Sequence, residues 1–421
     1  MAATARASTA TLKQPHGLSP RIRFLRDYYF QGCEREWNNE FTCWTTGEPW
    51  DVVYDEISFH IVPETYAFFP HFRASTLQAA HRVQTPPGFY QQSIAERRAW
   101  FIREVMVGHV PQEILPGDLL AGGRFNILAS RCWTRGEARE RDRLVLGKDG
   151  ARARVIEFHE HGYGNAGATS GHLIPDYRRV LEIGFKGIYR DLEQHYDRLS
   201  SRERRGPRGA QLRAMMPTAT MPRDLAARYA ALCRKLAAVE KDQDRRDELS
   251  TMAAQLVRVP WEPAETFWEA VQALWMAHML VMSDENYPGP GVSFGRIDQY
   301  LLPYWRRSIE AGMDPELGKE ILRCFFVHAN TAYDAMIRVG GNQGITAGFG
   351  QLLTLSGMGK GGEDLTNELT YAFLDVIDEM SPILEPKPNV RLHRGSPEEL
   401  LDRLVDMISR SQGAPFLLNF D

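Results

Sequence analysis

The chain has 421 residues, of which 43% are hydrophobic and 25% charged, and its formal net charge is −4. This balance fits a globular protein with a sizeable buried core, and it gives no global attraction to nucleic acid or to an anionic membrane. No apolar run reaches the roughly 20 residues that a bilayer-spanning helix needs, so we expect no membrane segment.

The first residues and the cysteines indicate the compartment. Residues 1–26 lack acidic side chains and are rich in Ala, Ser, Thr and Arg; a disordered tail is the preferred interpretation and an organelle signal the alternative. The five cysteines are widely separated and form no CxxC pair, which excludes zinc-ribbon and thioredoxin-type sites. We therefore expect free thiols and a cytoplasmic protein.

The N-terminal part predicts two helices and one strand. Helical patterns cover residues 21–30 and 93–107, and a turn at 116–118 leads into a short buried strand at 119–122. Between the helices, residues 31–72 are dense in aromatic side chains. These either pack between loops and the body or line a pocket for a flat ligand.

The remainder is mostly helical. We expect a strand at 153–158, a surface loop in the Arg-rich stretch 202–213, and a long helix over 224–256 with a solvated charge cluster at 240–248. Later helices are expected over a range that begins at Phe267 and over 315–336, 364–380 and 397–411. On the first of these, His278 lies on the apolar face with Phe267, which favours a hydrogen-bonded core histidine over a ligand.

Residues 171–188 read GHLIPDYRRVLEIGFKGI and are the most informative segment. A loop containing His172 leads into a helix whose first turn holds Pro175 and Asp176, because proline lacks the N–H that is unpaired there and a carboxylate favours the positive helix end. Loop–helix junctions often carry binding residues. His172 is therefore a site candidate, and capping or backbone bonding is its structural alternative.

Three other motifs are weaker. Residues 162–167 form a literal GxGxxG, but the next helix start lies eight residues beyond it, whereas a dinucleotide site needs the helix to open within the glycines. The glycine-rich stretch 356–362 lacks the Ser or Thr that follows Lys in a P-loop. Residues 159–161, HEH on the expected strand, have no third metal ligand nearby.

Five ordered motifs resemble one family. GHLIPDYRRVLEIGFKGI is similar to the GH-x-x-PDY pattern of the glycyl radical enzymes, the pyruvate formate-lyase-like group. TFWEAVQALW at 266–275, SFGRIDQY at 293–300, DLTNELT at 364–370 and PNVRLH at 388–393 follow in the order that this family shows. The resemblance covers about residues 20–421, so we divide the chain into a tail at 1–20 and one pyruvate formate-lyase-like domain at 21–421.

The resemblance implies an α/β fold, namely the first half of a ten-stranded β/α barrel. It implies a radical stored on a glycine and passed to a cysteine, and no bound cofactor, since a radical S-adenosylmethionine activase installs the radical. The family's radical cysteine and glycine are expected beyond Asp421, because GAPFLLNFD at 413–421 matches a segment that precedes them. No catalytic residue is therefore expected in this chain, which we interpret as a fragment, a split gene product or an inactive homologue.

The resemblance also implies substrate contacts. His172, Arg124 and Arg391 are candidates for binding substrate, with structural ion pairs as the alternative for the two arginines. The aromatic N-terminal region and GDLLAGGRFN at 117–126 favour decarboxylation of an arylacetate. Fumarate addition to a hydrocarbon and glycyl radical dehydration are alternatives.

A hypothesis of another class is a non-catalytic half-barrel subunit or scaffold. The partners implied by the enzyme interpretation are the activase and a small aromatic or hydrocarbon-type acid, with no nucleic acid and no membrane, in a homo-oligomer.

Overall fold

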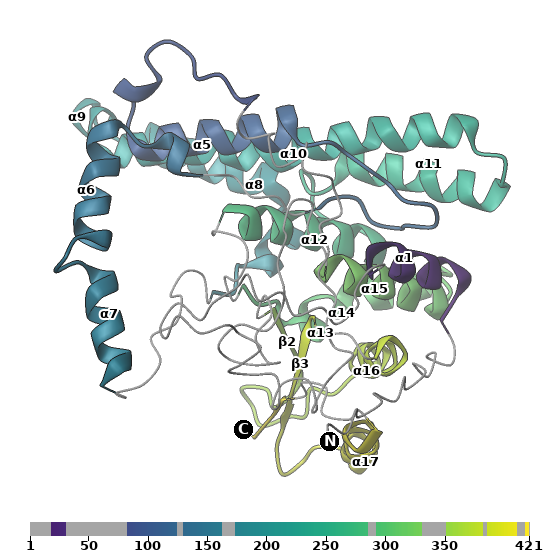
Figure 1. Ribbon diagram of the computed structural model, residues 1–421. Helices are drawn as coiled ribbons and strands as arrows, with labels where there is room; N and C mark the ends of the chain where they lie inside the picture. The colour runs from purple at the N-terminus through teal and green to yellow at the C-terminus, as the bar shows by residue number, and fades with distance from the viewer. Residues whose placement is uncertain are drawn as a thin grey trace, which may run out of the picture.

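The computed structural model describes residues 18–30, 82–123, 129–161, 173–284, 292–330, 351–381, 385–410 and 417–420. The described part is a layer of helices above a small parallel sheet, with helix α12 (Phe267–Asp284) between them (Figure 1). This confirms the predicted helix-rich α/β class. The aromatic stretch 31–72 lies outside the described residues.

The described residues of the N-terminal two thirds are mostly helical. The elements in order are α1 (Pro20–Phe30), a short turn (Phe89–Gln91), α5 (Ile94–Arg103) with a π-helical extension (Glu104–His109), a second turn (Ala129–Cys132), α6 (Arg135–Leu146), α7 (Ala151–Glu160), α8 (Tyr177–Asp197), α9 (Ser201–Arg205), α10 (Pro207–Val239), α11 (Gln243–Arg258) and α12. No described helix is both long and apolar enough to cross a bilayer.

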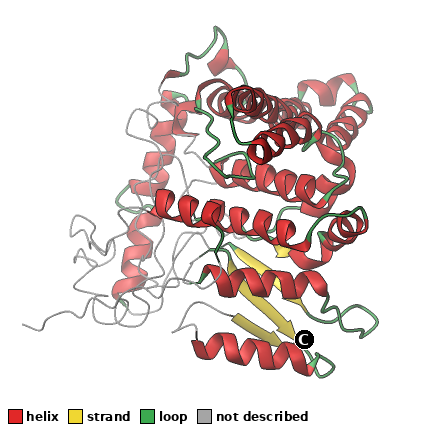
Figure 2. Ribbon diagram, turned by 90° about the vertical axis from the view of Figure 1, so that its right-hand side faces the viewer, coloured by secondary structure: helices red, strands yellow, loops and turns green. Residues whose placement is uncertain are grey.

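The C-terminal third forms the sheet. It contains β1 (Gly295–Arg296), α13 (Ile297–Tyr300), α14 (Leu302–Glu310), α15 (Pro315–Ala329), β2 (Leu352–Ser356), α16 (Glu368–Met380), β3 (Lys387–Leu392), α17 (Glu398–Arg410) and β4 (Leu417–Phe420). The four strands are parallel and lie in chain order. Helices α16 and α17 lie against the sheet (Figure 2), because each connects one strand to its parallel neighbour.

Helix α12 is buried on almost all sides, as its apolar sequence requires. Two of its polar side chains, one turn apart, bond the extended segment 119–122. Trp268 Nε1 donates to Leu119 O at 2.7 Å, and Gln272 bonds both the N–H (2.8 Å) and the C=O (2.9 Å) of Ala121. The prediction of a strand at 119–122 was wrong: the segment is extended, but helix side chains replace a neighbouring strand.

The strand predicted at 153–158 was also wrong, because these residues belong to α7. The HEH motif at 159–161 therefore lies at the C-terminal end of α7 and not on a strand. The GxGxxG that follows lies outside the described residues, and a helix precedes it where a dinucleotide site requires a strand.

Two further boundaries differ from the predictions. The Arg-rich stretch 202–213 is helical, spanning α9 and the start of α10, and the pattern predicted at 224–256 is two helices separated at 240–242. Helix α8 begins at Tyr177, so Pro175 precedes it and Asp176 is its cap, accepting from Arg179 N at 3.1 Å. The remaining predicted helices are confirmed where they are described.

Candidate functional site

One face of the parallel sheet is polar. Leu353 and Leu355 of β2, with Val390 of β3, are buried on the face that the helices cover. The alternate residues point to the opposite face, where register pairs Thr354 with Asn389 and Asn419 with Arg391. Asn419 Nδ2 donates to Asn389 Oδ1 at 2.6 Å. This face offers hydroxyl, amide and guanidinium groups to a polar ligand.

Ser356 ends β2 in an unusual conformation. Its φ of 61° makes it the one non-glycine residue with positive φ among the described residues, a state that costs about 1–3 kcal/mol unless its surroundings fix it. Three side chains do so. Its N–H donates to Asp298 Oδ2 at 2.7 Å, its C=O accepts from Arg296 Nη2 at 2.9 Å, and its hydroxyl lies 2.7 Å from Thr366 Oγ1.

The hydrogen bonds continue from Ser356 to the end of β3. Thr366 donates its hydroxyl proton to Asp364 at 3.0 Å, so Ser356 is the donor to Thr366. His393 Nδ1 accepts from Gly395 N at 3.2 Å, and its Nε2–H therefore donates to Asp364 Oδ1 at 2.9 Å. The chain of bonds joins the carboxyl ends of β2 and β3, where ligands of parallel sheets usually bind.

Asp298 is the buried carboxylate of this network. It also accepts from Thr370 Oγ1 at 2.6 Å, yet burial raises its pKa to about 6, against the lowering effect of its hydrogen bonds. No role was predicted for Asp298, Ser356 or Thr370. The sequence signal for Asp298 is the motif SFGRIDQY, which places Arg296 and Asp298 two residues apart so that both reach Ser356.

A second buried polar chain lies at the amino end of the sheet. Gln351, just before β2, donates its Nε2 to Ala329 O at 2.8 Å, so its Oε1 accepts from His278 Nε2 at 2.7 Å. His278 Nδ1 then accepts from the Tyr177 hydroxyl at 2.7 Å. The expectation of a hydrogen-bonded core histidine is confirmed. His278 also links Tyr177, the last residue of the GH-x-x-PDY motif, by hydrogen bonds to Gln351 beside β2.

This chain extends into the loop before β3. Glu385 is fully buried, accepting from Gln351 N at 3.0 Å and donating its own N–H to Asn330 Oδ1 at 3.0 Å. A separate buried pair joins Asp118, in the turn before the extended segment, to His328 Nε2 at 2.9 Å. Neither arrangement was predicted, because its members are far apart in sequence.

Of the predicted substrate-binding residues, the structure describes one. Arg391 is half-buried on β3, in register with Ser356 and with Asn419. His172 and Arg124 lie outside the described residues. Their described neighbours are fixed: Leu173 O accepts from Ser293 N at 2.9 Å beside β1, and Gly122 O accepts from Trp275 Nε1 at 3.2 Å.

The metal-ligating side chains and the cysteines in the described part of the chain form no further candidate site. No cluster of three or more His, Cys, Asp or Glu side chains there could hold a metal ion. Cys132, Cys233 and Cys324 are free, as predicted, and buried. Burial raises the pKa of Cys132 to about 11 and that of Cys233 to about 12, so neither is a thiolate at neutral pH.

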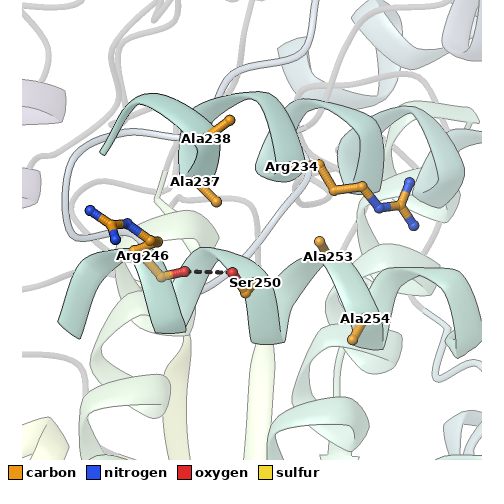
Figure 3. Close-up of a pocket in the computed structure, with 7 residues that line it drawn as sticks. All are labelled: Arg234, Ala237, Ala238, Arg246, Ser250, Ala253 and Ala254. Carbon is orange, nitrogen blue, oxygen red and sulfur yellow. Dashed lines mark hydrogen bonds between the residues drawn. The ribbon is translucent and has the colours of Figure 1, made fainter. Parts of the chain in front are cut away.

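A shallow groove of about 460 Å³ lies between α10 and α11, away from the sheet (Figure 3). Small side chains such as Ala237 and Ala253 leave the space. Arg246 on its rim donates to Glu240 O at 2.7 Å, and Ser250 donates to Arg246 O at 2.7 Å. The groove is a gap at a helix contact and has no carboxylate, thiol or imidazole in its lining.

Three curated relatives match between 46% and 62% of this chain, which spans about a third or less of their own length. It is 33% identical over 262 residues to the isethionate sulfite-lyase of Oleidesulfovibrio alaskensis, which is 60% of this chain and 30% of the relative. It is 30% identical to the (2S)-3-sulfopropanediol dehydratase of Klebsiella oxytoca over 62% of this chain and 32% of the relative. The indoleacetate decarboxylase of Tractidigestivibacter scatoligenes is 29% identical over 46% of this chain and 22% of its own.

Fold comparison agrees with these matches. The hydroxyproline dehydratase of Clostridioides difficile superposes on 94% of this chain and 50% of its own, with a TM-score of 0.67 and 19% identity. The described fold thus corresponds to about half of such a barrel. The sequence model of the pyruvate formate lyase-like family matches residues 130–421. With more than half of its length matched, the chain belongs to the pyruvate formate lyase-like family of glycyl radical enzymes.

Proposed function

We propose that this chain forms about half of the barrel of a glycyl radical enzyme that eliminates water or sulfite from a small polar substrate. The observation that carries the proposal is the kind of relative: a sulfite-lyase and a dehydratase match 60% or more of the chain at 30–33% identity. The decarboxylase match is shorter and weaker. The dehydratase alternative is therefore better supported than the arylacetate decarboxylation that the aromatic content favoured.

The polar face of the sheet supports the same choice. Elimination from a hydroxylated substrate needs groups that hold a hydroxyl and an anionic or hydroxyl leaving group. Arg391 can pair bidentately with a sulfonate or carboxylate, and Asn389 and Thr354 beside it can bond a hydroxyl. An arylacetate could also pair its carboxylate with Arg391, but its aromatic ring offers Asn389 and Thr354 no hydroxyl group to bond.

The reaction we propose is redox-neutral. A hydrogen atom leaves the carbon that bears the hydroxyl, the bond from the adjacent carbon to the leaving group breaks, and the hydrogen atom returns to that adjacent carbon. The hydroxyl proton departs, and the product is an aldehyde or ketone together with water or sulfite. In this proposal the radical cysteine and glycine belong to sequence outside this chain, and a radical S-adenosylmethionine activase is the partner that installs the radical.

His172 and Arg124 are proposed to complete the substrate contacts, with Arg391 as the anchor on the sheet. The chain supplies no catalytic residue in this scheme. Its contribution is to bind and orient the substrate and to exclude water from the site. The exclusion of water shields the radical.

The test is an anaerobic assay of the activated, complete radical enzyme that contains this chain. Isethionate, 1,2-propanediol and indoleacetate are offered separately. The proposal expects an aldehyde, with sulfite from isethionate, and no carbon dioxide from indoleacetate. Carbon dioxide and the methylarene from indoleacetate, without aldehyde from the other two, would show that the decarboxylase interpretation is right.

A further inference from the structure

We propose that Arg296 of β1 binds the anionic group of the substrate together with Arg391 of β3, so that the carboxyl ends of these strands form a two-arginine site for a sulfonate or sulfite. The inference rests on the proposed function and makes it more specific. It names the group by which the substrate is recognised, and it adds a binding residue for which no role was predicted.

Arg296 points to the polar face of the sheet. It is in register with Thr354 of β2, which is in register with Asn389 of β3, and register partners in parallel strands point to the same face. Arg296, Thr354, Asn389 and Arg391 are each partly exposed, whereas the residues that alternate with them on β2 and β3 are buried. Solvent therefore reaches all four side chains of the polar face.

The guanidinium group of Arg296 uses little of its hydrogen-bonding capacity. An arginine carries five N–H donors, yet among the described residues Arg296 makes one hydrogen bond, from Nη2 to Ser356 O at 2.9 Å. Its Nε is buried without a partner. Asp298, two residues further on, accepts from Ser356 N and Thr370 Oγ1 and forms no ion pair with it. A half-buried cation with so few acceptors suits a ligand that brings its own.

Ser356 brings the two arginines to the same place. Its C=O holds the Arg296 guanidinium at the end of β2. Its Cα is in register with that of Arg391 on the neighbouring strand, about 4.8 Å away. Both guanidinium groups can therefore approach one small anion beside Ser356, and the hydrogen bonds that fix Ser356 also fix the position of Arg296.

The charges on this face select an anion. None of the described strands contains Asp or Glu, so the two arginines have no carboxylate among the strand residues around them. The planar fork of arginine matches the paired oxygens of carboxylate and phosphate, and a sulfonate or sulfite offers the same pairs. The substrate's sulfonate and the released sulfite share this chemistry, and the experiment distinguishes these two sources.

The test measures binding to the complete radical enzyme that contains this chain, kept without its radical so that no turnover occurs. Calorimetry gives the Kd for isethionate, for sulfite and for neutral 1,2-propanediol. Arg296→Gln should weaken binding of the anions about tenfold or more and that of the diol by less than about threefold. Arg296→Lys keeps the charge without the fork and should lie between. Weakening of either anion supports the site, and the anion that is affected identifies the source.

A second variant leaves the bond from Arg296 to Ser356 in place. Thr354→Asp puts a carboxylate in register with Arg296, which would pair with it. Anion binding should then fall at least about tenfold below that of the isosteric but neutral Thr354→Asn. Thermal unfolding checks that each variant is folded. The matched control is Arg234→Gln, which removes the same charge at an exposed position of α10 and should leave all three Kd values within about twofold.

Three results would overturn the proposal: no binding of either anion by the wild type, equal weakening of anions and diol in Arg296→Gln, or equal anion binding by Thr354→Asp and Thr354→Asn. Failure of the proposed function gives a different result. Anion binding that depends on Arg296, without aldehyde in the activity assay, would support this site and reject the elimination. Aldehyde formation with anion binding independent of Arg296 would do the reverse.

Discussion

Asp298 accepts a 2.7 Å hydrogen bond from the peptide N–H of Ser356, which lies 58 residues further along the chain. This bond joins the motif SFGRIDQY to the carboxyl end of β2, and Thr366 and His393 extend the network into the motifs DLTNELT and PNVRLH. Three segments that mark the family in sequence are thus bonded around one strained residue. Their shared physical role is to fix the end of the central strand.

Replacing Asp298 tests this role. Asp298→Ala removes the acceptor of both the Ser356 N–H and the Thr370 hydroxyl, two buried donors, so the free energy of unfolding should fall by about 2–4 kcal/mol. Asp298→Asn keeps an oxygen for both donors and should lose less than about 1 kcal/mol. Urea unfolding at pH 7 measures both. Equal losses in the two variants would contradict the assignment of Asp298 as the shared acceptor.

The pKa of Asp298 predicts a pH dependence. Burial raises the pKa of this carboxyl from 3.8 to about 6, so between these values the folded protein holds a proton that the unfolded chain has released. The resulting stabilisation, on the order of 3 kcal/mol, is fully present below pH 3.8 and is lost as pH rises through 6. Unfolding of the wild type, relative to Asp298→Asn at each pH, should therefore become easier from pH 4 to pH 7. A flat difference would contradict the raised pKa.

The conformation of Ser356 makes a third prediction. Ser356→Gly relieves a left-handed backbone but loses the bond to Thr366; the two effects are each about 1 kcal/mol, and the net change should be within about 1 kcal/mol. Ser356→Val puts a β-branched side chain in that conformation and should cost about 2–4 kcal/mol. Thr354→Val, on the same strand, is the control and should change stability by less than about 1 kcal/mol. Thermal unfolding ranks the three variants.

The helices could be predicted from sequence because their apolar spacing and caps are local. The strand predicted at 153–158 was wrong because apolar and polar residues alternate there over too short a run to distinguish a strand from a helix. The segment 119–122 was recognised as buried and extended, but sequence does not show that side chains of α12, some 150 residues away, bond its backbone.

The site was less predictable than the fold. Arg391 was proposed from its motif, and the structure places it on the polar face, while its role stays a prediction. No role was predicted for Asp298, although it lies in the motif SFGRIDQY. Its partner Ser356 is far away in sequence and comes close only through strand pairing. His278 was correctly interpreted as a core residue, since an apolar helix face predicts burial, although its partners Tyr177 and Gln351 could not be foreseen.

Gln272 allows a test of the segment that leads toward Arg124. Its side chain bonds both peptide groups of Ala121, and both residues are buried. Gln272→Ala leaves a buried N–H and C=O without partners and should lower the free energy of unfolding by about 2–4 kcal/mol. Hydrogen exchange of the Ala121 amide should speed up with it. Gln211→Ala, at an exposed position of α10, is the control and should change neither. Unchanged Ala121 exchange in Gln272→Ala would contradict the described bonding.

Substitution of Arg391 distinguishes a substrate-binding role of this side chain from a structural one. If it binds the anionic group of a sulfonate in the complete activated enzyme, Arg391→Gln should raise KM for isethionate by about tenfold to a hundredfold, the effect of losing a bidentate charged pair. KM for neutral 1,2-propanediol should then change by less than about threefold, because a diol has no charge to lose. Arg391→Lys keeps the charge without the planar fork and should lie between. A structural role would instead lower stability and impair both substrates alike, so equal effects on the two KM values, together with a lower unfolding temperature, would assign Arg391 to the scaffold.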